Sequence, residues 1–267
     1  MWHLILLINK YKFICSFKST KKATVKLQDN KTGHITVYST TETIPILNKK
    51  RMKSLLIFDL DGTLLDTVAD LATSTNYALT QCGFSIHKTD DYRFFVGNGI
   101  NKLFERALPE KSRTSENILQ VRNHFLKHYE FHNTDLTTPY PGVIKLLKEL
   151  QASKIKLAVA SNKYQQATGK LIRHFFPEIT FIAVFGQREG IPTKPDSRII
   201  HDILSIAKVK KEEVLYIGDS GVDMQTAQNA GIDAAGVTWG FRPRTELEEF
   251  SPKYIVSEAK DISEIIQ

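Results

Sequence analysis

The sequence has little cysteine and no long apolar run. Its two cysteines, Cys15 and Cys82, are far apart and belong to no motif. Two isolated thiols exclude a disulfide framework and a zinc site built from cysteines, and they fit a reducing compartment, so we expect a cytoplasmic protein. The short apolar run at residues 2–8 is far below the roughly 20 residues that a membrane-spanning helix needs. It also lacks the preceding basic residue of a secretory signal. We therefore expect no membrane partner.

The basic charge of the chain is confined to its first segment. The net charge is +7, but residues 1–51 contain ten Lys and Arg against two Asp and Glu, whereas residues 52–267 contain 26 against 27. A basic excess restricted to one end does not indicate a nucleic-acid partner. This segment shows no clear periodicity, and Met52 stands directly before the first convincing strand. We expect residues 1–51 to be a poorly ordered leader or a start-site artefact.

One stretch predicts both a central strand and a site. Leu55–Phe58 is an uninterrupted apolar run, which is typical of a strand buried on both faces of a parallel sheet. Asp59 and Asp61 follow at once, and Gly62 allows a sharp turn behind them. Ligands of open parallel sheets bind at the carboxyl ends of the strands. The strand therefore places two acids at the edge where a site is expected.

The rest of the chain separates into a helical insertion and an alternating part. Residues 67–138 show helical periodicity and no strand of the buried parallel kind. Residues 139–267 alternate helices with strands, which predicts a doubly wound parallel sheet of the Rossmann-like α/β class. We predict a catalytic core of residues 52–66 and 139–267, with an all-helical cap inserted at 67–138.

Polar residues recur where the predicted strands end. Ser161 and Asn162 follow the strand at 156–160, and Asp219 and Asp223 follow the strand at 214–217. Lys194 precedes the helix predicted at 197–207. Each residue has an ordinary use in a turn or a helix cap. Their common position at one edge of the sheet indicates a shared site.

These residues also match four motifs of a known family in order. The motifs are D-L-D-G-T at 59–63, Ser161 in V-A-S-N, Lys194 in K-P-D, and G-D-S-G-V-D at 218–223. In them the chain resembles the haloacid dehalogenase-like hydrolase superfamily. Through D-G-T-L-L-D-T, V-G-N-G and Y-P-G-V, at 61–67, 96–99 and 140–143, it is most similar to the phosphoglycolate phosphatase group. The resemblance covers residues 52–267 and implies a phosphatase with a helical cap.

The two adjacent acids suit phosphoryl transfer. A carboxylate is a competent nucleophile at phosphorus, so we assign that role to Asp59. Asp61 is the candidate acid and base that protonates the leaving oxygen and then activates water. The resemblance implies the same roles. An acid at the second position favours phosphate transfer over dehalogenation.

A cation is needed among so many acids. Like charges about 4 Å apart cost on the order of 4 kcal/mol per pair at an effective dielectric of 20, and Mg²⁺ is the simplest hard ion for carboxylates and phosphate oxygens. We assign Asp59, the backbone carbonyl of Asp61, and Asp219 as ligands, with Asp223 in support. The expected phosphate-binding residues are Thr63, Ser161, Asn162 and Lys194. The expected specificity residues of the cap are Gly97, Asn98 and Gly99.

Two other clusters are given ordinary roles. His124, His128 and His132 follow four-residue steps on a predicted helix, but no acid or cysteine joins them at a matching position. We do not expect a metal site there. Arg242 and Arg244 follow the strand at 234–238, so they face the side of the site. We expect both in a solvated loop, with steering of a phosphate or carboxylate as the alternative.

The predicted function is Mg²⁺-dependent hydrolysis of a small phosphorylated metabolite, with 2-phosphoglycolate as the favoured substrate. A phosphosugar mutase or a pyrophosphatase on the same fold remains an alternative, and so does a non-catalytic phosphometabolite sensor. The complete set of acids, Ser and Lys argues against the sensor. A monomer or a homodimer fits the sequence equally well.

Overall fold

The strand that precedes Asp59 lies in the middle of a six-stranded sheet. The computed structural model describes residues 3–8, 11–19, 22–29, 32, 35–40 and 52–266. In it β5 (Leu55–Phe58) joins five later strands in the order β12-β11-β10-β5-β8-β9, and every neighbouring pair is parallel. These strands are β8 (Lys156–Tyr164), β9 (Phe181–Gln187), β10 (Val214–Gly218), β11 (Asp233–Val237) and β12 (Tyr254–Val256). The predicted parallel sheet is confirmed.

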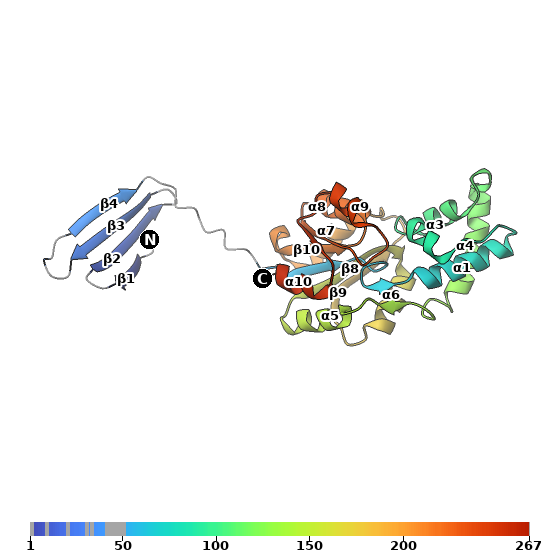
Figure 1. The fold of residues 1–267 in the computed structure, drawn as a ribbon, viewed down its shortest axis with the longest axis horizontal. Coiled ribbons are helices and arrows are strands. Elements are labelled where there is room, and N and C mark those ends of the chain that lie inside the picture. The colour runs from blue at the N-terminus through green and yellow to red at the C-terminus, as the bar shows by residue number, and fades with distance from the viewer. Residues whose placement is uncertain are drawn as a thin grey trace. The chain divides into compact units, whose positions relative to one another are not determined.

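Helices cover both faces of this sheet (Figure 1). Leu56 and Phe58 belong to the apolar cluster of one face, and Leu55 and Ile57 to that of the other. The helices of the first face are α5 (Val143–Ala152), α6 (Gln165–Phe175) and α10 (Ala259–Ile265), and those of the second are α7 (Arg198–Ala207), α8 (Gly221–Ala230) and α9 (Arg244–Glu249). Because side chains alternate along a strand, burial of both faces requires an apolar residue at every position.

Residues 68–129 form a separate helical layer, in the segment predicted as an inserted cap. Its helices are α1 (Val68–Gln81), α2 (Tyr92–Phe95), α3 (Ile100–Ala107) and α4 (Ser115–Tyr129), with single 3-10 turns at Thr89–Asp91 and Glu110–Ser112. They share an apolar cluster in which Phe125 stacks on Tyr129 and meets Phe104 edge to face. In the part of the chain that the structure describes, no helix is long and apolar enough to cross a bilayer. The exact cap boundaries stay a prediction.

The two links between core and cap run side by side. The two-residue strands β6 (Leu65–Asp66) and β7 (Thr138–Pro139) pair antiparallel. Close by, the buried Asp70 carboxylate accepts hydrogen bonds from the backbone N–H groups of Leu136 at 2.9 Å and Thr137 at 2.8 Å. The Thr137 hydroxyl donates a third bond at 2.6 Å. The segments by which the chain enters and leaves the cap are therefore adjacent and hydrogen-bonded to each other.

Strand β8 is longer than predicted. It was expected at residues 156–160 but continues to Tyr164, so that Ser161, Asn162 and Lys163 lie inside the strand, near its carboxyl end. Its pairing with β9 is irregular between Ala160 and Tyr164. Polar residues at the open edge of a sheet do not resemble a buried strand, which explains why the sequence pattern ended the strand early.

The first fifty residues form a unit of their own. Its described strands are antiparallel and ordered β1-β2-β3-β4, with bounds His3–Ile8, Tyr11–Ser19, Lys22–Asp29 and Ile35–Thr40. The sequence analysis found no clear periodicity here, yet Ala23, Val25 and Leu27 alternate with polar residues, a pattern typical of a strand with one covered face. Part of residues 1–51 lies outside the described residues, and these strands do not test whether the protein needs the segment. The leader or start-site artefact stays a prediction.

Candidate active site

Three carboxylates meet at the carboxyl edge of the sheet. Asp59 follows β5, Asp219 follows β10, and Asp223 lies in the first turn of α8. Because Phe58 is paired with Ile217, the segments that follow β5 and β10 leave the sheet side by side. Each of the three acids offers an oxygen within 4.8 Å of the other two, and all are buried. The sequence-predicted acids are therefore brought together.

Glycines make room for Asp219. Gly62 has a φ of +87°, and a Cβ there would lie 2.3 Å from Asp219 Oδ2. A Cβ on Gly240 would lie 2.3 Å from Asp219 Cβ. The Thr63 hydroxyl donates to Asp219 Oδ1 at 3.2 Å, and the Phe241 N–H donates to Oδ2 at 2.8 Å. Side chains larger than hydrogen at 62 or 240 would displace this carboxylate.

Lys194 is the cation among the acids. Its Nζ lies 2.9 Å from Asp59 Oδ1 and 2.7 Å from Asp223 Oδ1, and it donates to the Tyr216 hydroxyl at 3.0 Å. Burial lowers the pKa of Lys194, but the carboxylates of Asp223 and Asp59 outweigh it and raise the pKa well above its ordinary value. Lys194 is therefore a fixed positive charge at the site.

Asp223 has both oxygens engaged. Its Oδ1 accepts bonds from Lys194 and from the Tyr216 hydroxyl at 3.1 Å. Its Oδ2 accepts from the backbone N–H and the hydroxyl of Ser220, at 3.1 Å and 2.6 Å, which closes the capping box of α8. This arrangement suits a support for Lys194 more than a direct metal ligand.

The remaining acids fit a divalent cation. Burial raises the pKa of Asp59 to about 7, with Asp223 and Asp61 adding to the shift and Lys194 opposing it. Burial likewise raises the pKa of Asp219 well above its ordinary value. Asp59 Oδ1 is buried and, apart from the ion pair with Lys194, accepts no hydrogen bond from the described residues. Clustered carboxylate oxygens with spare acceptor capacity are what Mg²⁺ prefers, so the acidic cluster can bind a metal.

Asp61 is not part of this cluster. Its carboxylate accepts bonds from Lys163 Nζ at 3.0 Å and 3.2 Å, and from the Thr67 hydroxyl at 2.7 Å. Lys163 in turn lies over the Tyr129 ring of α4, with Nζ 4.9 Å from the ring centroid. The sequence analysis missed Lys163. The only signal was its position directly after Ser161 and Asn162.

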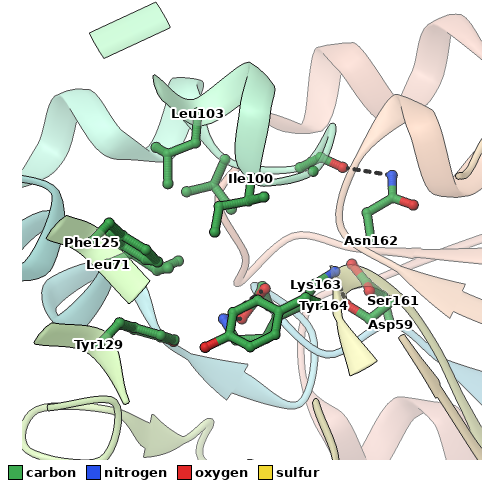
Figure 2. A pocket seen from close by; sticks show the side chains of 14 residues that line it. Asp59, Leu71, Ile100, Leu103, Phe125, Tyr129, Ser161, Asn162, Lys163 and Tyr164 are labelled. Atoms are coloured by element: carbon green, nitrogen blue, oxygen red, sulfur yellow. Dashed lines mark hydrogen bonds and ion pairs between the residues drawn. The ribbon is translucent and has the colours of Figure 1, made fainter. Parts of the chain in front are cut away.

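Asn162 links the core to the cap. Its Nδ2 donates to the carbonyls of Gly97 at 3.0 Å (Figure 2) and Lys194 at 3.1 Å, and its Oδ1 accepts the Lys194 N–H at 2.8 Å. The Ser161 hydroxyl lies beside it and accepts the Lys163 N–H at 3.2 Å. The Asn162 side chain therefore positions the Lys194 backbone, and its predicted contact with phosphate would use the main chain.

A cavity of about 50 Å³ lies between these residues and the cap. Figure 2 shows the core side chains on one side and apolar cap residues on the other. The cap contributes Leu71, Val96, Gly97, Gly99, Ile100, Leu103, Phe125 and Tyr129, and the core contributes Asp59, Asp61, Ser161, Asn162, Lys163 and Tyr164. Of the three predicted cap residues, Gly97 and Gly99 line the cavity. Asn98 instead accepts a bond from Arg106 Nη2 at 2.7 Å.

The histidines form a stack. The ring of His128 lies between those of Tyr77 and His132, at centroid distances of 4.3 Å and 4.2 Å. His132 pairs with Asp135. The acids at the sheet edge are the one cluster of three possible metal ligands among the described residues, so no metal centre is assigned to the histidines.

The solvated loop expected at Arg242 and Arg244 is partly wrong. The side chain of Arg244 is exposed as expected and pairs with Glu248, but Arg244 begins helix α9 and does not lie in a loop. That of Arg242 is only 10% exposed and donates to backbone carbonyls of the cap. The sequence did not reveal this contact because it depends on how the cap sits on the core.

Comparisons with known proteins agree with this geometry. The family model described as haloacid dehalogenase-like hydrolase matches residues 56–237. A phosphoglycolate phosphatase of Mesorhizobium japonicum is 33% identical over 77% of this chain and 91% of its own. One of Psychrobacter arcticus is 35% identical over 75% and 90%. The crystal structure of a putative phosphoglycolate phosphatase from Lactobacillus delbrueckii subsp. bulgaricus is 32% identical, covers 81% of this chain and 99% of its own, and superposes with a TM-score of 0.76.

Proposed function

Since the chain belongs to the haloacid dehalogenase-like hydrolase family and is a phosphatase, we propose that it hydrolyses a small phosphate monoester through an aspartyl-phosphate intermediate, with Mg²⁺ as cofactor. The observation that supports this most is the placement of Asp59. Its carboxylate stands at the end of a central strand, 2.9 Å from the Nζ of the fixed cation Lys194, and a second acid, Asp61, follows two residues later.

Two steps follow from the placement of these acids. In the first, an oxygen of Asp59 bonds to phosphorus while the ester P–O bond breaks, and Asp61 gives a proton to the leaving oxygen. In the second, Asp61 takes a proton from water, whose oxygen attacks phosphorus. The acyl-phosphate P–O bond then breaks, which releases phosphate and restores Asp59. The side chain of Asp61 suits this role because it lies outside the cluster of Asp59, Asp219 and Asp223 and lines the cavity.

The phosphoryl group and the metal share the surrounding donors. Asp59, Asp219 and the backbone carbonyl of Asp61 would hold Mg²⁺, with Asp223 in support through Lys194. A cation there would offset the charge of the carboxylates and of the phosphate dianion. The groups proposed to hold phosphoryl oxygens are Lys194, the hydroxyls of Thr63 and Ser161, and backbone N–H groups at Gly62 and Asn162.

A substrate with a second negative charge suits the cap side of the cavity. Lys163 brings a buried ammonium to the cavity wall next to Asp61. The Tyr129 hydroxyl, contributed by the cap, is buried and has no hydrogen-bond partner among the described residues. An ammonium has three donors, of which Lys163 directs two at Asp61. The third donor and the Tyr129 hydroxyl would bind a small carboxylate. This favours 2-phosphoglycolate, as does the name of the curated relatives.

A substrate panel tests the proposal. Release of inorganic phosphate is measured for 2-phosphoglycolate, ethyl phosphate, sugar phosphates and pyrophosphate, with and without Mg²⁺. We expect 2-phosphoglycolate to give the highest kcat/KM, and only with Mg²⁺. A phosphosugar mutase would return the phosphoryl group to a sugar, a pyrophosphatase would prefer pyrophosphate, and a sensor would release nothing. We propose a cytoplasmic enzyme, either monomeric or a homodimer.

Lys163→Met is expected to reduce discrimination between substrates. Loss of the ammonium should lower kcat/KM for 2-phosphoglycolate about tenfold to a hundredfold more than for ethyl phosphate, since a charged hydrogen bond contributes about 1.5–3 kcal/mol. Ethyl phosphate has no carboxylate, so its loss of kcat/KM measures only how removal of the Lys163 ammonium affects Asp61. Lys145→Met, on the exposed face of α5, is the matched control. Equal losses for both substrates would contradict the carboxylate contact.

Gly97→Ala and Gly99→Ala are expected to change substrate preference. Both glycines line the cavity with φ of +117° and +86°, a region that costs other residues about 1–2 kcal/mol. The loop should shift to relieve this strain, so relative kcat/KM across the panel should change severalfold while the Mg²⁺ dependence stays the same. Gly83→Ala, also at positive φ in the cap but away from the cavity, controls for strain alone. A uniform loss across the panel would show that the loop does not contact the leaving group.

A further inference from the structure

We propose that Arg242 is a positioning residue that fixes the cap segment 93–99 over the active site, and that it couples this segment to the metal ligand Asp219. The proposal rests on the proposed function, because it concerns how the same site is assembled. Arg242 does not itself line the cavity, but it binds the carbonyl of Val96, which does.

The Arg242 guanidinium binds the carboxyl end of α2. Its Nη1 donates to the carbonyl of Arg93 at 2.6 Å, and its Nη2 donates to that of Val96 at 2.9 Å. The last carbonyls of a helix have no partner within the helix, so each needs a donor from elsewhere. The planar guanidinium supplies two N–H donors at fixed positions in one rigid group, whereas the donors of an ammonium rotate about a single point. Its Cζ also lies 5.6 Å from the centroid of the Phe94 ring.

A second arginine holds the same segment from within the cap. Arg106 of α3 donates through Nη1 to the carbonyl of Phe95 at 2.9 Å, and through Nη2 to Asn98 Oδ1 at 2.7 Å. Segment 93–99 is therefore held from the cap by Arg106 and from the core by Arg242. Asn162 Nδ2 donates to the carbonyl of Gly97, the residue directly after Val96, whose carbonyl Arg242 binds. The two core residues together fix the start of the loop that lines the cavity.

The core residues next to Arg242 contact Asp219, one of the three acids at the sheet edge. The residue before Arg242 donates its N–H to Asp219 Oδ2 at 2.8 Å, and Gly240 packs so tightly that a Cβ would lie 2.4 Å from the Gly62 carbonyl. Trp239 Nε1 donates to the carbonyl of Thr63 at 3.1 Å. Residues 239–242 are thus bonded to both loops that carry the acids. A shift of Asp219 would be transmitted through one peptide unit to Arg242 and then to the cap.

This arrangement predicts an effect on substrate affinity more than on chemistry. In this proposal substrate binds only while segment 93–99 is held over the cavity, so a smaller population of that state raises KM by the same factor and leaves kcat of the bound complex nearly unchanged. For Arg242→Met we expect KM to rise about tenfold or more, in keeping with the loss of two charged hydrogen bonds. We expect kcat to change by less than about threefold. Arg242→Lys keeps the charge and one donor direction, so its KM should lie between those of the parent and Arg242→Met.

Hydrogen exchange provides a readout that does not depend on turnover. We expect Mg²⁺ alone to slow amide exchange of residues 92–99 in the parent protein but not in Arg242→Met. Arg244→Met is the matched control, since Arg244 is two residues away and exposed, and it should behave as the parent in both assays. Unchanged KM and exchange in Arg242→Met would overturn the proposal, and so would equal changes in Arg244→Met. If the parent hydrolyses no compound of the panel, the proposed function fails, and the exchange experiment still decides the role of Arg242.

Discussion

Asp59→Asn is expected to abolish phosphate release while the protein stays folded. The amide keeps the shape of the side chain but cannot form the acyl phosphate, so kcat should fall at least about a thousandfold. Stability should not fall with it. Because burial raises the pKa of Asp59 to about 7, the charged form is unfavourable in the folded state, and a neutral side chain relieves that cost.

Two measurements on the same preparations check this result. Phosphate release from 2-phosphoglycolate is compared with the melting temperature in the absence of metal, for the parent, Asp59→Asn and Asp90→Asn. The side chain of Asp90 is 90% exposed, so that variant controls for loss of a negative charge. Residual activity of Asp59→Asn within tenfold of the parent would rule out Asp59 as the nucleophile. A fall of many degrees in its melting temperature would mean that the loss reflects unfolding.

Asp61→Asn is expected to separate the two chemical steps. Its kcat for an alkyl phosphate should fall by about 10²–10⁴, the usual contribution of a general acid and base. A good leaving group such as p-nitrophenolate departs without a proton, so the first step should survive with p-nitrophenyl phosphate. The second step still needs a base. The phosphoryl group should therefore accumulate on Asp59.

This outcome is visible as a burst of p-nitrophenol close to one equivalent of enzyme, together with a gain of one phosphoryl group in the intact mass. The double variant Asp59→Asn, Asp61→Asn should show neither, which ties the adduct to Asp59. If Asp61→Asn loses the same activity on both substrates and gives no burst, Asp61 is not the acid of the first step. Thr67→Val, which removes one hydrogen bond to Asp61, should show a milder form of the same behaviour.

The acids at the sheet edge were predictable from the sequence because one rule places them. Buried parallel strands are uninterrupted apolar runs, and their carboxyl ends lie at one edge, so residues that follow two such runs must be neighbours. Leu55–Phe58 and Val214–Ile217 follow this rule, and Asp59 and Asp219 come together as expected. Lys194 lies in a loop, and the pairs that it makes with Asp59 and Asp223 needed the structure.

Contacts between core and cap were not predictable in the same way. Lys163 and Arg242 are ordinary basic residues in the sequence, and the cap groups that they contact, the Tyr129 ring and the carbonyls of Arg93 and Val96, are distant in the chain. Which ring or carbonyl they contact depends on the angle between core and cap, and no periodicity encodes that angle. The strands at the start of the chain were missed for another reason. In Lys22–Asp29, for example, apolar and polar residues alternate, and a search for doubly buried strands passes over such a pattern.

The central place of β5 in the sheet has a consequence for synthesis of the chain. β5 is the first strand of its domain to be made, but both of its neighbours come much later: Leu55–Phe58 pairs with Lys156–Val159 of β8 on one side and with Val214–Ile217 of β10 on the other. No local hairpin can shelter so apolar a segment, because parallel strands need long crossovers. A nascent chain therefore keeps its most apolar strand exposed until Gly218 has left the ribosome. Chaperone binding during translation should concentrate on this segment, and chains arrested before β10 should aggregate.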